Sequence, residues 1–268
     1  MVRRIIKYLR HQRVSWLKTF IINFKCLPFS QARHFPIYVY SDTIISSYGH
    51  IVIFSDEIKS GMIKIGRRNF FKGYKTYFVN AGTIEFDGRF MVEGGTCFNN
   101  MGGHVKLGAD ARICEICKLL CMKRIEIGAS TRIAFGAIIM DTDFHYCVDT
   151  KKRIVRNAEA TIKIGSYNWF GNNCSVMKGT VTPDYAIVAS KSLCNKDYSQ
   201  SPLYPVFAGS PAKCVSDGLR RVYNVGSRRK IHQAFMQDEI LRRVEVNQAG
   251  MDWDKFCLGG DDILFSED

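Results

Sequence analysis

The chain has 268 residues, of which 46% are hydrophobic and 24% are charged. This length and composition allow a substantial core and argue against disorder for most of the chain. The 38 Lys and Arg residues outnumber the 25 Asp and Glu residues and give a net charge of +13, which indicates an anionic partner or a solvated basic face.

The N-terminal segment, residues 1–36, carries basic residues without acids, and the chain reaches position 41 before any acid occurs. Apolar residues recur at helical spacing from Ile5 to Phe24, which predicts a basic amphipathic helix. Such a helix can lie on an anionic bilayer, or it can pack on the end of the following domain. Lys18 and Lys25 interrupt the best candidate for a membrane span, which needs ~20 apolar residues, and no signal-peptide pattern is present. We therefore expect a cytoplasmic protein, peripheral to the inner face of the membrane if the helix binds lipid.

A six-residue period dominates the middle of the chain. Bulky apolar anchors occur at Leu107, Ile113, Leu119, Ile127, Ile133, Ile139, Ile164, Phe170, Val176 and Val188, with a weak Thr182. Small or β-branched companions precede them by two residues, at Ala111, Cys117, Ile125, Thr131, Ala137, Ile162, Cys174, Thr180 and Ala186. This period fits a coil with three flat faces, in which each anchor stacks on the anchor one coil away.

The hexads predict an all-β parallel β-helix over residues 37–215. Residues 36–53 supply the opening strands, and "RRNFFKGYKTYFVNAG" and "GGTCFNNMGGH" look like excursions from the coil. A two-residue slip between Leu119 and Ile127 indicates a bulged corner. The largest interruption, residues 140–161, predicts an extruded loop.

Ten cysteines are present, with Cys114, Cys117 and Cys121 close together. A structural zinc site needs a further ligand pair, and none is evident, so we expect no metal. Cys117 falls on a companion position, where it serves as a small hydrophobe. After the hexads, residues 216–268 form an extension that reads as helical, with Ile231, Phe235, Ile240 and Leu241 on one stripe, and that ends in an acidic tail.

The closing hexads, "IGSYNWFGNNCSVMKGTVTPDYAIVASKSLCNKDY" followed by "PVFAGSPAKCV", resemble the hexapeptide-repeat acyltransferases, whose fold is a left-handed parallel β-helix. The loop stretch "DTDFH" is similar to the Asp-x-Asp-x-His loop of sugar O-acetyltransferases related to maltose and galactoside acetyltransferases. The N-terminal lead-in resembles that of capsule and surface-polysaccharide members.

The resemblance implies a homotrimer with acetyl-CoA in the groove between two neighbouring β-helices and His145 as the catalytic base. It places eight residues near the CoA arm or its phosphates: Trp169, Gly171, Gly179, Ala189, Ser190, Lys191, Lys196 and Lys213. Lys191 stands where many members have glycine, and a glycine there would relax a tight turn.

His145 is the only histidine in an acid-rich loop. A neutral imidazole can take the proton of a sugar hydroxyl and return it to the departing thiolate. Asp143 could orient the imidazole or bind the acceptor's hydroxyls. Cys147 could suggest a nucleophile, but direct transfer needs none. Three closely spaced histidines, as in γ-class carbonic anhydrases, are absent from the sequence.

We therefore expect an acetyl-CoA-dependent O-acetyltransferase that acts on a sugar hydroxyl in capsular or lipopolysaccharide synthesis. Its partners would be a saccharide or lipid-linked oligosaccharide, not nucleic acid. The alternatives are an amino-sugar N-acetyltransferase, a serine acetyltransferase or a noncatalytic β-helix scaffold.

Overall fold

The computed structural model describes residues 13–67, 70–71, 73–237, 243, 246 and 250–259. Two compact units are present, Met1–Gly218 and Leu219–Asp268. The first unit contains every strand in the described part of the chain, and the second contains two helices.

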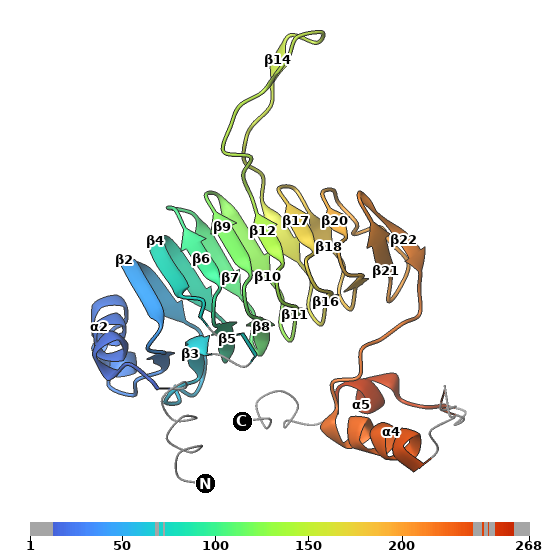
Figure 1. The fold of residues 1–268 in the computed structure, drawn as a ribbon, viewed down its shortest axis with the longest axis horizontal. Helices are drawn as coiled ribbons and strands as arrows, with labels where there is room; N and C mark the ends of the chain where they lie inside the picture. The colour runs from blue at the N-terminus through green and yellow to red at the C-terminus, as the bar shows by residue number, and fades with distance from the viewer. Residues whose placement is uncertain are drawn as a thin grey trace. The chain divides into compact units, whose positions relative to one another are not determined.

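The strands of the first unit coil around three faces (Figure 1). One face is a sheet of parallel strands closed by an antiparallel hairpin at its end. Its order is β1 (Ile37–Val39), β3 (Ile63–Arg67), β5 (Phe90–Glu93), β8 (Ala111–Ile113), β11 (Arg132–Ile133), β16 (Trp169–Phe170), β19 (Ile187–Val188), β21 (Val206–Gly209) and β22 (Ala212–Ser216).

The other two faces belong to one sheet that bends around a corner. The long strands β2 (Thr43–Ile53) and β4 (Thr76–Phe86) pair with each other and contribute to both faces. One face continues through β6 (Cys97–Asn100), β9 (Lys118–Cys121), β12 (Ile138–Met140), β17 (Ser175–Met177) and β20 (Leu193–Cys194). The other continues through β7 (His104–Leu107), β10 (Arg124–Ile127), β15 (Ile162–Ile164) and β18 (Val181–Thr182).

The predicted stacking of anchors is confirmed. Ile133 pairs with Ile113 on one side and with Phe170 on the other, and Phe170 pairs with Val188 three hexads later. Every anchor and every companion position is buried. The predicted fold class, an all-β left-handed parallel β-helix with helical extensions at both ends, is therefore confirmed.

The opening coils are more regular than the sequence suggested. The stretch around Cys97–Asn100, expected to be an excursion, forms β6 and pairs with β4 and β9. The six-residue pattern is weak in this stretch because asparagine, rather than an aliphatic residue, occupies the buried corner. The amide nitrogen of Asn100 donates to the side-chain oxygen of Asn80 at 2.9 Å, and that of Asn80 donates to the carbonyl of His50 at 3.2 Å.

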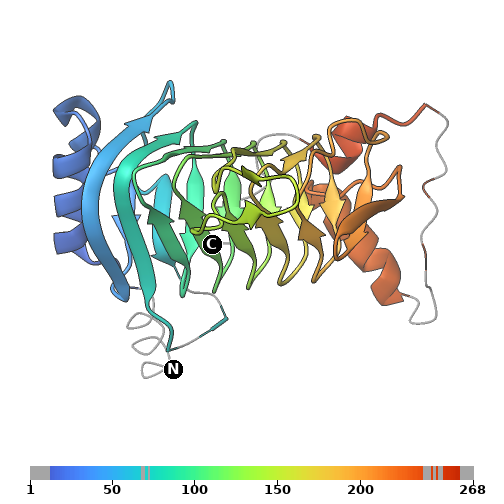
Figure 2. The same ribbon diagram turned by 90° about the horizontal axis from the view of Figure 1, so that it is seen from above.

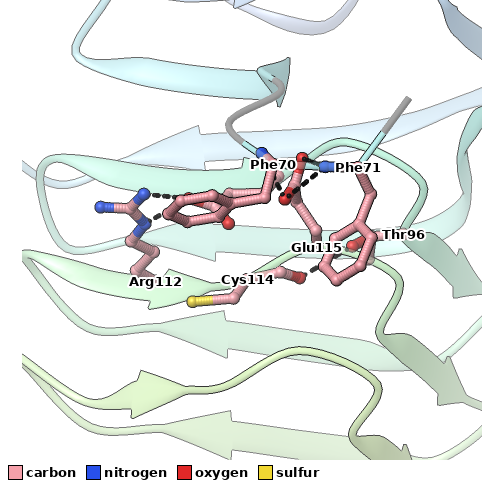
Figure 3. A network of polar contacts seen from close by, with 7 residues as sticks. Phe70, Phe71, Thr96, Arg112, Cys114 and Glu115 are labelled. Carbon is pink, nitrogen blue, oxygen red and sulfur yellow. Dashed lines mark hydrogen bonds and ion pairs between the residues drawn. The ribbon is translucent and has the colours of Figure 1, made fainter.

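The other expected excursion, "RRNFFKGYKTYFVNAG", is shorter than the sequence suggested, because β4 begins within it at Thr76. A buried carboxylate holds it against the coils (Figure 3). Glu115, 1% exposed, accepts hydrogen bonds from the amides of Phe70 at 2.9 Å and Phe71 at 3.2 Å. The ring of Phe71 also packs edge-on against Phe135.

The N-terminal end of the β-helix is covered by α2 (Trp16–Cys26), followed by the single turn α3 (Phe29–Ala32) (Figure 2). Two buried polar side chains of α2 bind the open edge of β1. Thr19 accepts from the amide of Val39 at 3.0 Å, and Asn23 bonds both the amide and the carbonyl of Ile37. The helix therefore packs on the end of the β-helix, and the earlier part of the predicted amphipathic segment, residues 1–12, lies outside the described residues.

The second unit holds α4 (Val225–Gln237) and α5 (Trp253–Cys257). The predicted helix is confirmed over α4, whereas Ile240 and Leu241 of its stripe lie outside the described residues. The amide of Tyr223 donates to the carbonyl of Cys257 at 2.7 Å, and Arg220 pairs with Asp254 at 2.7 Å. These contacts connect the two ends of the unit.

Candidate active site

The large interruption of the hexads is a loop that leaves the β-helix after β12 and returns at β15. Ile162 pairs with Ile125 although they are separated by 37 positions, whereas a regular coil needs three hexads. The loop stands away from the coils and carries a short antiparallel hairpin, β13 (Val148–Asp149) and β14 (Ile154–Val155) (Figure 1). Residues of the loop can therefore reach beyond their own β-helix.

Asp141 is a structural residue at the foot of this loop. It is fully buried, and its carboxylate accepts the backbone amides of Met122, Lys123 and Arg124, each at 2.8 Å. These amides form the corner where the sequence slips by two residues. The bulged corner thus exists because an acid from the next coil satisfies its amides.

The two strands of the loop are joined at their base. The amide of Asp143 donates to the carbonyl of Ala158 at 2.9 Å, and the amide of Ala160 donates to the carbonyl of Asp141 at 3.0 Å. Lys178, from the neighbouring corner, adds a clamp. Its ammonium group pairs with the carboxylate of Asp143 at 2.7 Å and donates to the carbonyl of Asn157 at 2.7 Å.

A pocket of about 470 Å³ lies between the loop and this corner. His145 and Asp143 line it together with Lys178, Arg156, Cys147, Val148 and Asp149. The pocket therefore combines an imidazole with two cationic and two acidic side chains. A polar site of this kind suits a ligand rich in hydroxyl groups.

The two predicted catalytic residues differ in their surroundings. The imidazole of His145 is exposed, and none of the hydrogen bonds among the described residues involves it. The carboxylate of Asp143 pairs with Lys178 rather than with His145. In this structure Asp143 therefore fixes the base of the loop, and the orienting role expected from the sequence stays a prediction.

Four of the predicted donor-binding residues lie at one corner of the β-helix: Gly171, Ala189, Ser190 and Lys191. This corner joins the face that contains β16 and β19 to the face that contains β17 and β20. A side-chain carbon at Gly171 would lie 2.6 Å from the amide nitrogen of Ser190, so the coils approach too closely for any other residue. The hydroxyl of Ser190 accepts from the amide of Asn172 at 3.1 Å. Lys191, next to Ala189 and Ser190, adopts the left-handed backbone conformation with φ of +62°.

The departure from glycine at position 191 is thus accommodated, since this lysine takes the turn that glycine favours. Its side chain is exposed, as is that of Lys213 on β22. Neither ammonium group forms an ion pair with a described residue, which leaves both able to meet phosphate.

The remaining predicted donor-binding residues lie on other parts of the surface. Trp169 is 40% exposed on β16, beside Arg132 and Ile187 of the adjacent strands. Gly179 and Lys196 lie at the corner from which the loop emerges, and Lys196 stacks over the ring of Tyr198. None of the eight predicted donor-binding residues lines the pocket of His145.

Sequence reasoning missed Lys178 and Arg156, which line the pocket. Lys178 precedes the corner glycine Gly179 in the coil beside the loop, and that position is the signal that could have found it. Arg156 lies on the returning strand of the loop, where the sequence offers no marker.

Two of the three clustered cysteines, Cys117 and Cys121, are buried in the core. All ten cysteines are free, and no group of three potential metal ligands occurs in the part of the chain that the structure describes. Burial raises the pKa of Cys117 to about 12 and that of Cys194 to about 12. These thiols stay protonated and serve as small core residues.

No family model and no curated protein matches the chain. Solved structures with a similar course of the chain include the polysialic acid specific acetyltransferase NeuO, with a TM-score of 0.44 and 16% identity over 75% of this chain and 99% of that chain. The polysialic acid O-acetyltransferase OatWY has a TM-score of 0.42 and 17% identity over 74% and 94%. AntD, an N-acyltransferase from Bacillus cereus in complex with dTDP and coenzyme A, has a TM-score of 0.36 and 10% identity over 75% and 88%. Likeness at this level carries no information about activity.

Proposed function

We propose that the protein is an acetyl-CoA-dependent O-acetyltransferase that acts on a sugar hydroxyl in surface-glycan synthesis. The observation that carries the proposal is His145, exposed in a polar pocket on a loop whose base is fixed by Asp141 and Lys178. The "DTDFH" resemblance assigns the imidazole its chemistry. A scaffold has no need for such a loop.

The acetyl group would pass directly from the thioester to the sugar by addition and elimination at the thioester carbonyl, without an acyl-enzyme. His145 removes the proton of the sugar hydroxyl while its oxygen attacks that carbonyl. The C–S bond of the tetrahedral intermediate then breaks, and the imidazolium returns the proton to the CoA thiolate. Cys147 need not form an acyl intermediate in this sequence.

We further propose a homotrimer in which the loop of one subunit reaches the donor groove of the next. The separation of the His145 pocket from Trp169, Gly171 and Lys191 within one chain supports this arrangement, since both sets are needed for transfer. Lys191 and Lys213 would meet the phosphates of CoA, and the exposed face of Trp169 would meet its organic arm. The enzyme would act in the cytoplasm, at the inner face of the membrane, on a saccharide or a lipid-linked oligosaccharide.

The decisive test is a His145→Ala variant assayed for CoA release with acetyl-CoA and a panel of acceptors. We expect turnover to fall by about 10²- to 10⁴-fold, the usual contribution of a general base. Titration calorimetry should show CoA binding unchanged. Unchanged turnover would exclude the mechanism, and absence of CoA binding by the wild-type protein would favour the scaffold.

The acceptor panel separates the enzyme alternatives. A sugar with hydroxyl groups alone should be acetylated, and preference for an amino sugar or for serine would replace the proposal with the corresponding transferase.

A further inference from the structure

Helix α2 exposes apolar side chains on its outward face, although its buried face also contributes Ile22 to the core. Its inward face uses Thr19 and Asn23, both fully buried, to bind the edge of β1. Its outward face carries Trp16, 61% exposed, and Leu17, 71% exposed. An amphipathic surface helix normally presents polar side chains to solvent, so the exposed apolar face needs its own explanation.

The exposed apolar side chains of α2 and α3 are here named the aromatic platform: Trp16, Leu17, Phe20, Phe24 and Phe29. Trp16 and Leu17 lie one helical turn before Phe20 and therefore on the same face of α2. The ring of Phe24 stacks on Phe20 with centroids 4.5 Å apart and lies 6.2 Å from the ring of Phe29. The platform is therefore already assembled and does not have to be ordered on binding. Contiguous exposed apolar patches of this kind mark interaction sites.

The position of the platform fits a flat partner. Helix α2 covers the N-terminal end of the β-helix, at the opposite end from β21 and β22 (Figures 1 and 2). Because Thr19 and Asn23 face the coils, the platform faces away from them. In the proposed trimer, with its symmetry axis along the β-helix, three platforms would point in the same direction.

The charge of the residues around the platform indicates which kind of partner it binds. Arg13, Lys25 and Arg33 are exposed on or next to α2 and α3, and no acid occurs before Asp42. A second copy docking through the same face would bring like charges together. So would the chain's own residues 1–12, which carry Arg3, Arg4, Lys7 and Arg10. An anionic surface is the occupant that this charge favours.

We propose that the aromatic platform inserts into the interface of an anionic lipid bilayer, with the surrounding basic residues binding its headgroups. Trp and Phe rings partition to the boundary between headgroups and acyl chains. Basic residues near an anionic leaflet strengthen such binding. No helix in the described part of the chain is long and apolar enough to cross a membrane.

The test is co-sedimentation of the full chain with vesicles of phosphatidylcholine alone and of phosphatidylcholine mixed with phosphatidylglycerol. We expect binding to the mixed vesicles that weakens as salt is raised. A Phe20→Ser/Phe24→Ser variant should bind about tenfold less or weaker still, because two exposed rings lose their apolar environment. The matched control is Leu203→Ser/Val215→Ser, which removes two exposed apolar side chains elsewhere in the β-helix and should bind like the wild type.

Thermal unfolding of both variants shows whether the fold is intact, and since neither change touches the proposed catalytic residues, this test is independent of the transferase activity. Absence of binding to mixed vesicles, or equal binding to neutral ones, would overturn the proposal. If an Ile5→Ser/Ile6→Ser/Leu9→Ser variant binds where the wild type does not, residues 1–12 cover the platform. A change of oligomer mass in the Phe20→Ser/Phe24→Ser variant, without vesicle binding by the wild type, would assign the platform to a second copy.

Discussion

At the scale of single residues, the loop depends on two side chains that belong to different coils. Asp141 satisfies the amides of a corner one coil earlier, and Lys178 from the next coil holds both strands of the loop base. The acids of the loop therefore serve different purposes. Asp141 stabilises the fold, whereas Asp143 connects the base of the loop to the pocket through its ion pair with Lys178.

Lys178 is a positioning residue for the proposed reaction. Replacing it as Lys178→Met removes the pairing with Asp143 and the bond to Asn157, so the loop should hold His145 less firmly. We expect kcat to fall by about tenfold or more while KM for acetyl-CoA changes little, because misplacement of a catalytic group costs rate rather than donor binding.

Two variants serve as controls for this prediction. Lys178→Arg keeps the charge and should restore part of the rate. Lys163→Met removes an exposed lysine from β15 and should act like the wild type. Equal loss of kcat in both methionine variants would contradict the positioning role.

Replacing Asp141 should lower the stability of the fold. Asp141→Ala removes the buried acceptor of three amides, those of Met122, Lys123 and Arg124, which should lower the free energy of unfolding by about 3 kcal/mol or more. Asp141→Asn keeps one acceptor oxygen and should cost less. Urea denaturation measures both, with the exposed Asp217→Asn as the control, and a destabilisation no greater than that of the control would exclude the corner role.

At the scale of elements, the coils from β7 onward were predictable because each hexad repeats the same burial of one anchor and one small companion. The opening coils were predictable only in part, because Asn80 and Asn100 replace aliphatic residues at the buried corner and the long strands β2 and β4 bend across it. The loop was predictable as an interruption. The contact between the loop and Lys178 was not predictable, because it depends on which coil lies next to the loop.

Cysteine at interior positions of the coils makes the β-helix sensitive to alkaline pH. Burial raises the pKa of Cys117 to about 12 and of Cys194 to about 12, from the ordinary 9.0. The unfolded chain releases these protons from about pH 9, while the folded chain holds them until about pH 12. The stabilising contribution is therefore fully present below pH 9 and is lost as the pH rises toward 12.

The expected loss at pH 10 relative to pH 7 is roughly 1.4 kcal/mol for each of these thiols. Urea denaturation at the two pH values should show this decrease for the wild type. In a Cys117→Ala/Cys194→Ala variant the difference between the two pH values should shrink. Removing the exposed thiols, as Cys147→Ala/Cys214→Ala, should leave the difference unchanged, and an equal effect of both pairs would contradict the assignment to buried thiols.

At the scale of the whole molecule, the proposed active site needs residues that one chain keeps apart. The pocket of His145 contains none of the predicted donor-binding residues, and the loop stands away from its own coils (Figure 1). The proposed closed ring of subunits would bring the loop of each chain to the groove of its neighbour. This arrangement makes the loop and the groove separable by mutation.

Complementation between two inactive chains tests the arrangement. One chain carries His145→Ala and keeps an intact groove, and the other carries Trp169→Ala/Lys191→Glu and keeps an intact loop. Co-expressed in equal amounts with different affinity tags, they should recover about a quarter of wild-type turnover, because most random trimers contain one intact loop facing one intact groove. Each variant alone should stay inactive. If the mixture is as inactive as its components while light scattering shows mixed trimers, loop and groove of the same chain form the site, and the exchange between subunits is wrong.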